Sequence, residues 1–91
     1  MALIVHFRPQ GMNQDKYAEI LRRLEAAGAG APAGRLHHAC YGDREALRVT
    51  DVYDTPQSFE AFGKTLVPIL TAMGVDVGKP EVVEVHNIIR G

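Results

Sequence analysis

The sequence predicts one small α+β domain, residues 1–91, with elements in the order β-α-β-β-α-β. Three observations support this prediction. Residues 2–8 alternate between two faces as in a strand. Thr55-Pro56 marks a helix start, because threonine caps a helix and proline at its first position gives up no hydrogen bond. Residues 81–89 are rich in strand-favouring Val and Ile. The order is that of a ferredoxin-like fold, an antiparallel sheet with both helices on one face.

The first strand and the first helix have clear boundaries. Pro9 stops the strand, and Asn13 is a suitable N-cap for a helix that reaches about Ala27. Gly28 is a fitting C-terminal stop. The helix carries apolar residues at helical spacing, which are Tyr17, Ile20, Leu21 and Leu24.

The sequence in the middle of the chain predicts a loop followed by a hairpin. Residues 28–34 are all Gly, Ala or Pro, and they predict a flexible connection, which could form a flap at the mouth of a pocket. Residues 35–42 and 46–54 then form two strands, with residues 42–45 as their turn.

The second helix begins after Thr55 and ends at Gly74. Pro68 lies inside it, so we expect a kink or a break near residues 65–67. The stripe expected to be buried consists of Phe59, Phe62, Leu66, Ile69, Leu70 and Met73. The last strand, 81–89, follows.

Composition excludes several classes of function. The net charge is −1 and Lys and Arg are scattered, so nucleic-acid binding is not expected. A single cysteine, Cys40, cannot form an internal disulfide, which favours a reducing compartment. No apolar run reaches the roughly 20 residues that a membrane span needs. We therefore expect a cytoplasmic protein that does not enter a membrane.

The two faces of the predicted sheet differ, and the difference predicts a homodimer. The helix-facing side is expected to carry Leu3, Val5, Phe7, Val83, Val85 and Ile89. The other side is expected to carry Ile4, His6, Arg8, Glu84, His86 and Ile88. This second face is too apolar to leave in water and too polar for a sealed core. We expect it to pack on the same face of a second copy and to leave a ligand cleft between the sheets.

The strand order and the segment 49–62 resemble a known group of proteins. In that segment a strand ends in the aromatic residue Tyr53, a short capped turn follows, and a helix opens with an aromatic pair. Over residues 3–89 the chain is similar to the dimeric α+β barrel superfamily, within it the antibiotic-biosynthesis-monooxygenase-like group. The resemblance implies a ligand bound inside the barrel, with Tyr53 lining the site.

Candidate catalytic residues follow from strand alternation and strand order. Tyr53 and Asp51 share one face of their strand. In a ferredoxin-like sheet the first strand lies between the third and the last, so we expect His6 to lie near Asp51 on one side and His86 on the other. A His–Asp pair can orient an imidazole for proton transfer. The hypothesised catalytic residues are His6, Asp51 and His86, unless they only hydrogen-bond across a wet dimer cleft.

Further residues are assigned to substrate binding. Of the pair His37-His38, only one can face the pocket, and we favour His38 because Cys40 shares its side. Arg8 could anchor an anionic group, or it could pair with Glu84 or Asp51. The hypothesised substrate-binding residues are therefore Arg8, His38 and Tyr53.

No cofactor and no metal are expected. A set of His6, His38 and His86 with Asp51 or Glu84 would be the metal alternative, but no short ligand spacing supports it. Haem-degrading members of the superfamily usually supply a histidine from the second helix, and residues 56–73 contain none. The tryptophan and asparagine common in cofactor-independent members are also not matched, since the chain has no tryptophan and Asn87 falls on the apolar side of its strand by alternation.

The function that the resemblance implies is a small-molecule enzyme similar to cofactor-independent monooxygenases. It would act on an aromatic or polyketide-like compound. The alternative is a non-catalytic dimeric module that binds a ligand or completes an assembly.

Overall fold

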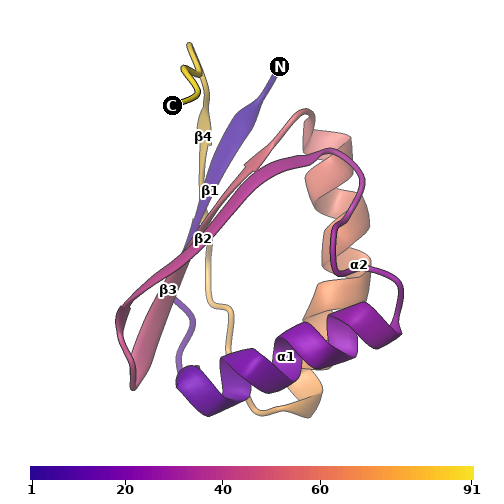
Figure 1. The fold of residues 1–91 in the computed structure, drawn as a ribbon, viewed down its shortest axis with the longest axis vertical. Coiled ribbons are helices and arrows are strands. Elements are labelled where there is room, and N and C mark those ends of the chain that lie inside the picture. The colour runs from indigo at the N-terminus through magenta and orange to yellow at the C-terminus, as the bar shows by residue number, and fades with distance from the viewer.

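Four antiparallel strands form one sheet, and two helices cover one of its faces (Figure 1). The computed structural model describes the whole chain, Met1–Gly91. The elements are β1 (Leu3–Phe7), α1 (Gln14–Ala26), β2 (Arg35–Asp43), β3 (Ala46–Tyr53), α2 (Pro56–Ala72) and β4 (Glu81–Glu84). The strand order β2-β3-β1-β4 confirms the predicted ferredoxin-like arrangement.

The sequence signals for the helix ends are confirmed by their geometry. The Asn13 side chain accepts a hydrogen bond from the Lys16 backbone N–H, at 2.9 Å. Thr55 does the same for Ser58 at 3.1 Å, with Pro56 in the first turn. Gly74 follows α2 with a φ of 70°, a left-handed conformation that glycine adopts without strain.

Pro68 does not break α2, contrary to one of the two expected outcomes. The helix runs without interruption from Pro56 to Ala72. Phe62 and Leu70 are buried against the sheet on either side of the proline. Packing of both halves therefore holds the helix together across the missing backbone donor.

The core lies between the sheet and the helices. The buried apolar residues are Leu3, Val5, Phe7, Met12, Ile20, Leu24, Leu47, Val49, Tyr53, Phe62, Leu70 and Val75. The first strand thus turns Leu3, Val5 and Phe7 toward the helices, as predicted. Within this core lies one buried charged side chain, Asp51, which is 2 % exposed.

The last strand differs from the prediction in length and in register. It ends at Glu84 rather than 89, because its partner β1 begins at Leu3, which lies opposite Glu84. Val82 lies opposite Val5 and Val83 opposite Ile4. Since opposed residues share a face, Val83 points away from the helices, and the predicted assignment of this strand is wrong.

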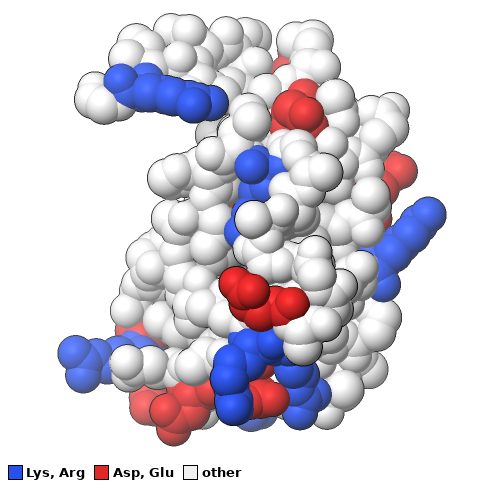
Figure 2. All heavy atoms as spheres, turned by 45° about the vertical axis from the view of Figure 1, so that its right-hand side comes forward, with Lys and Arg blue, Asp and Glu red and all other residues white.

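The outer surface carries charges of both signs. On the side seen in Figure 2, Lys and Arg are interspersed with Asp and Glu. Glu19 on α1 forms ion pairs with both Arg22 and Arg23. Neither helix is long and apolar enough to cross a membrane.

Candidate functional site

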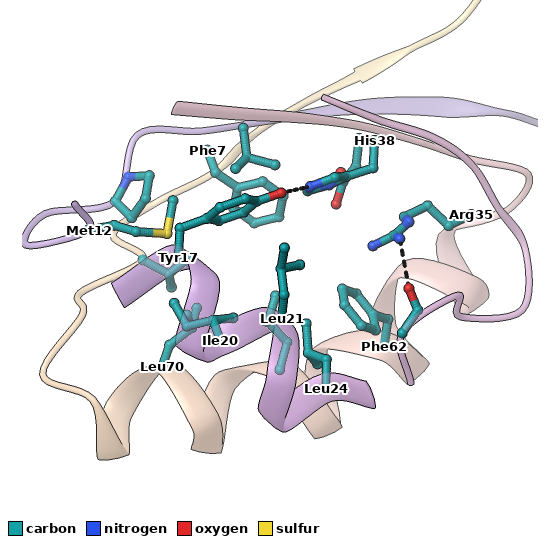
Figure 3. Close-up of a pocket in the computed structure, with 16 residues that line it drawn as sticks. Phe7, Met12, Tyr17, Ile20, Leu21, Leu24, Arg35, His38, Phe62 and Leu70 are labelled. Carbon is teal, nitrogen blue, oxygen red and sulfur yellow. Dashed lines mark hydrogen bonds and ion pairs between the residues drawn. The ribbon is translucent and has the colours of Figure 1, made fainter. Parts of the chain in front are cut away.

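A pocket lies between α1, α2 and the helix-facing side of the sheet (Figure 3). Its volume is about 60 Å³, and most of its lining is apolar. The lining residues that carry polar groups are Tyr17, Arg35, His38 and Asp51. They come from α1, β2 and β3, so three separate elements position them.

His38 and Asp51 form the centre of the site. They are opposed in the β2–β3 pair, and His38 Nδ1 lies 2.5 Å from Asp51 Oδ1. A carboxylate oxygen accepts, so Nδ1–H donates to Asp51 and this bond fixes the orientation of the ring. In the neutral imidazole this leaves Nε2 as an acceptor that faces α1.

Tyr17 on α1 occupies that acceptor. Its hydroxyl lies 2.6 Å from His38 Nε2, and the two rings stack with an interplanar angle of 8°. Burial, with a smaller contribution from the Cys40 thiol, raises the pKa of Tyr17 to about 12. The phenol therefore keeps its proton at neutral pH and donates it to the imidazole.

Tyr53 completes the chain of hydrogen bonds. Its hydroxyl donates to Asp51 Oδ2 at 2.9 Å, and its side chain is fully buried. Burial, and then the charge of Asp51, raises the pKa of Tyr53 far above its ordinary value. Tyr17, His38, Asp51 and Tyr53 thus form one continuous relay, and no buried side-chain polar atom in the structure lacks a partner.

The structure brings three of the six predicted site residues together, namely His38, Asp51 and Tyr53. The preference for His38 over His37 as the pocket-facing histidine agrees with this geometry, since His37 lines a groove on the opposite face. Cys40 lies opposite the buried Val49 and packs against the hydrophobic core. Burial raises the pKa of its thiol, which keeps it protonated.

The expected contact between His6 and Asp51 is wrong. Asp51 lies opposite Val5 on the helix side, while His6 lies opposite Thr50 and makes a 3.0 Å contact with its hydroxyl on the other face. Adjacent residues of a strand point to opposite faces, so His6 and Asp51 cannot meet.

The other two predicted residues also lie away from the pocket. Arg8 is exposed and lines a polar recess with His6 and Lys79. His86 lies beyond the end of β4 and is exposed. No three His, Cys, Asp or Glu side chains gather as a metal site would require, so the histidine–carboxylate set considered from the sequence is not assembled.

Two residues of the site were not predicted, Tyr17 and Arg35. Helical spacing alone makes Tyr17 one more apolar position in the stripe of α1, although a tyrosine in a buried stripe needs a partner for its hydroxyl. Arg35 stands at the start of β2, directly after the small-residue loop. Its guanidinium reaches the pocket from there (Figure 3).

Solved structures with the same fold are known, although sequence comparison finds no match. No protein-family model and no curated protein sequence matches the chain. A candidate antibiotic biosynthesis monooxygenase of Chloroflexus aurantiacus is similar in structure, with 21% identity, a TM-score of 0.60 and coverage of 99% of this chain and 97% of that one.

Two further solved structures have a similar fold. SnoaB, a cofactor-independent oxygenase of Streptomyces nogalater, has 14% identity and a TM-score of 0.61, with 99% of this chain and 96% of SnoaB covered. A candidate monooxygenase of Caulobacter crescentus has 14% identity and a TM-score of 0.58, with coverage of 97% and 89%. The chain therefore has the ferredoxin-like fold of the antibiotic biosynthesis monooxygenase-like proteins.

Proposed function

We propose that this protein is a small-molecule oxygenase that uses the Tyr17–His38–Asp51 relay as its base. The observation that carries the proposal is the hydrogen-bonded His38–Asp51 pair, held beneath the helices and joined to a phenol that lines the pocket. An imidazole oriented by a buried carboxylate is suited to general base catalysis.

The relay offers a defined path for one proton. A substrate at the pocket passes a proton to the Tyr17 oxygen as Tyr17 passes its own to His38 Nε2, 2.6 Å away. The Asp51 carboxylate then stabilises the imidazolium. Tyr53, which donates to the other carboxylate oxygen, keeps Asp51 in place.

Oxygen chemistry without a cofactor requires a substrate that supplies the electrons. An activated methylene between aromatic rings meets this need, because its carbanion is delocalised and can reduce dioxygen. The balance is CH₂ + O₂ → C=O + H₂O, with one oxygen atom entering the substrate and the other leaving as water. An aromatic or polyketide-like substrate with an acidic methylene fits both the base and this balance.

Such a substrate must enlarge the pocket. A drug-sized ligand fills roughly 300 Å³ or more, whereas the cavity measures about 60 Å³. Leu21 on α1 lines the pocket and is 41 % exposed, and Gly30 brings the small-residue loop to its edge. We expect this side of the pocket to open, as the loop composition suggested.

The experiment is oxygen uptake with anthrone, whose central methylene is acidic and whose product is a quinone. We expect turnover above the uncatalysed rate for the natural sequence, and a loss of about 10²-fold or more in His38→Gln and Tyr17→Phe. His6→Gln is the matched control, since His6 bonds Thr50 on the opposite face.

Two results contradict the proposal. Equal losses in His38→Gln and His6→Gln would remove the special role of the relay. No oxygen uptake above background with anthrone or related acidic methylenes would favour the alternative, a non-catalytic ligand-binding module.

We also propose that a second copy covers the outer face of the sheet. That face carries Ile4, His6, Val52 and Val83, and Val83 is 47 % exposed. An apolar patch of this kind favours association. The mass by light scattering should be that of a dimer, and Ile4→Lys should yield monomers, whereas Val67→Lys on the exposed side of α2 should not.

A further inference from the structure

Arg35 is a cation that lines the pocket and forms no ion pair with a carboxylate. Its guanidinium carbon lies 5.5 Å from the centre of the Phe62 ring, and one terminal nitrogen donates to the Gly30 carbonyl at 3.2 Å. The ion pairs of the structure join Glu19 to Arg22 and Arg23, the Asp51 carboxylate is hydrogen-bonded to His38, and Arg35 pairs with no carboxylate. Figure 3 shows Arg35 reaching in from β2, across the hollow from Tyr17.

The other polar groups of the pocket are already occupied by one another. Both oxygens of Asp51 accept from His38 and Tyr53, and both ring nitrogens of His38 are paired. A guanidinium has five N–H donors, and Arg35 uses one of them in its bond to the Gly30 carbonyl. Free donors and a positive charge therefore coincide at one place in a mostly apolar pocket.

We propose that Arg35 binds the carboxylate of a small aromatic substrate. The planar guanidinium matches a carboxylate with two parallel hydrogen bonds, which a lysine cannot do. The ring of the ligand would lie among the apolar residues that line the pocket beside Arg35, such as Leu24, Phe62 and Leu66. This inference deepens the proposed function, because it takes the same pocket as the substrate site.

Binding at Arg35 would also release the loop that narrows the pocket. The present acceptor, the Gly30 carbonyl, is neutral, and a carboxylate is the stronger acceptor for a guanidinium. An anionic ligand that bonds to the same guanidinium nitrogen therefore displaces Gly30 from Arg35. Because Gly30 lies in the small-residue loop at the edge of the pocket, this exchange links ligand binding to the enlargement that an aromatic ring requires.

The test is a titration of the ¹⁵N-labelled protein with benzoate and, separately, with the neutral isostere benzamide, followed by NMR. We expect benzoate to bind at millimolar concentration and to shift the Ala29, Gly30 and Ala31 amides, with benzamide about tenfold weaker or worse. Arg35→Met should weaken benzoate about tenfold or more, and Arg35→Lys should weaken it less. The matched control is Arg48→Met, since Arg48 is exposed and pairs with Tyr41 on the outer face.

The inference is overturned if benzoate does not bind, if benzamide binds as well as benzoate, or if Arg35→Met and Arg35→Lys both bind it as the natural sequence does. A well-dispersed spectrum of Arg35→Met shows that its loss of benzoate binding is not unfolding. The result is separable from the oxygenase test. Arg35-dependent benzoate binding without any oxygen uptake would support the carboxylate site and contradict the oxygenase proposal. Oxygen uptake that does not depend on Arg35 would support the oxygenase proposal and contradict the carboxylate site.

Discussion

His38 on β2 faces Asp51 on β3 across a strand pair, with His38 Nδ1 2.5 Å from Asp51 Oδ1. Both residues sit on strands rather than on loops, so the backbone of the sheet sets their separation. Asp51 is nearly inaccessible, while the histidine side chain is 23 % exposed. The pair therefore joins a buried anchor to a ring that reaches the pocket, as a positioned base requires.

Removing the Tyr53 hydroxyl should destabilise the protein. Tyr53→Phe keeps the ring and its contacts with Phe59 and Phe62, but it takes one donor from the buried Asp51 carboxylate. A buried acceptor that loses its partner costs about 1–3 kcal/mol. Urea denaturation should show a fall of that size in the free energy of unfolding.

The same change at Tyr41 is the control. Its hydroxyl also makes a hydrogen bond, to Thr50 at 3.1 Å, but Tyr41 is 44 % exposed and water can replace the contact. We expect Tyr41→Phe to change stability by less than about 0.5 kcal/mol. Equal losses in the two variants would mean that burial of Asp51 is not the source of the effect.

Stability should fall as the pH rises above about 10. The pKa of Tyr17 is raised to about 12 in the folded protein from an ordinary value of 10.0. Between these values the unfolded chain loses the proton and the folded chain keeps it, so the folded state binds more protons and loses stability with rising pH. The contribution is fully present below pH 10.

The measurement is urea denaturation at a series of pH values from neutral to alkaline. In Tyr17→Phe the free energy of unfolding should fall less steeply with rising pH. The fall that remains should come from Tyr53, whose pKa is also raised. An unchanged slope in Tyr17→Phe would contradict the assignment of a buried, proton-donating phenol at this position.

Replacing Pro68 should stabilise α2. Proline inside a helix removes a backbone hydrogen bond, at a cost of about 3 kcal/mol, although it also restricts the unfolded chain. Since Pro68 is exposed and the helix continues through it, Pro68→Ala should raise the free energy of unfolding by about 1–3 kcal/mol. The exposed neighbour Val67 provides the control, and Val67→Ala should change stability by no more than about 0.5 kcal/mol. No gain in Pro68→Ala would show that the ring contributes packing that outweighs the missing bond.

Local chemistry made most of the fold predictable. Caps at Asn13 and Thr55, glycine stops and strong alternation around Val5 act within a few residues, and the structure follows them. The last strand was harder, because valines at 82, 83 and 85 fall on both faces and give no unique register. There the pairing with β1 decides which valine faces the helices.

The site was less predictable because it depends on contacts between elements. Alternation correctly placed Asp51 with Tyr53, but the same rule puts His6 on the opposite face from Val5, and Val5 is the residue opposite Asp51. Strand order alone therefore suggested a wrong neighbour, and only the register excludes it. The bond from Tyr17 to His38 joins a helix to a strand, a tertiary contact that no spacing in the sequence encodes.

Gly34 should be among the positions least tolerant of a side chain, because two side chains occupy the space beside it. It has a φ of 84°, and an added Cβ would collide with Ser58 and Asp54, while its carbonyl accepts the Asp54 backbone N–H at 2.8 Å. Gly28, at the other end of the loop, has a similar φ of 75° but open space around it. Both alanine variants bear the strain of a left-handed backbone, about 1–2 kcal/mol, so the difference between them measures the collision. Gly34→Ala should lose at least about 1–3 kcal/mol more than Gly28→Ala in urea denaturation, because the end of the loop beside Arg35 is fixed against α2. Equal losses of unfolding free energy in the two variants would mean that the loop at Gly34 can move to accept a side chain. The pocket could then open on both sides of Gly30.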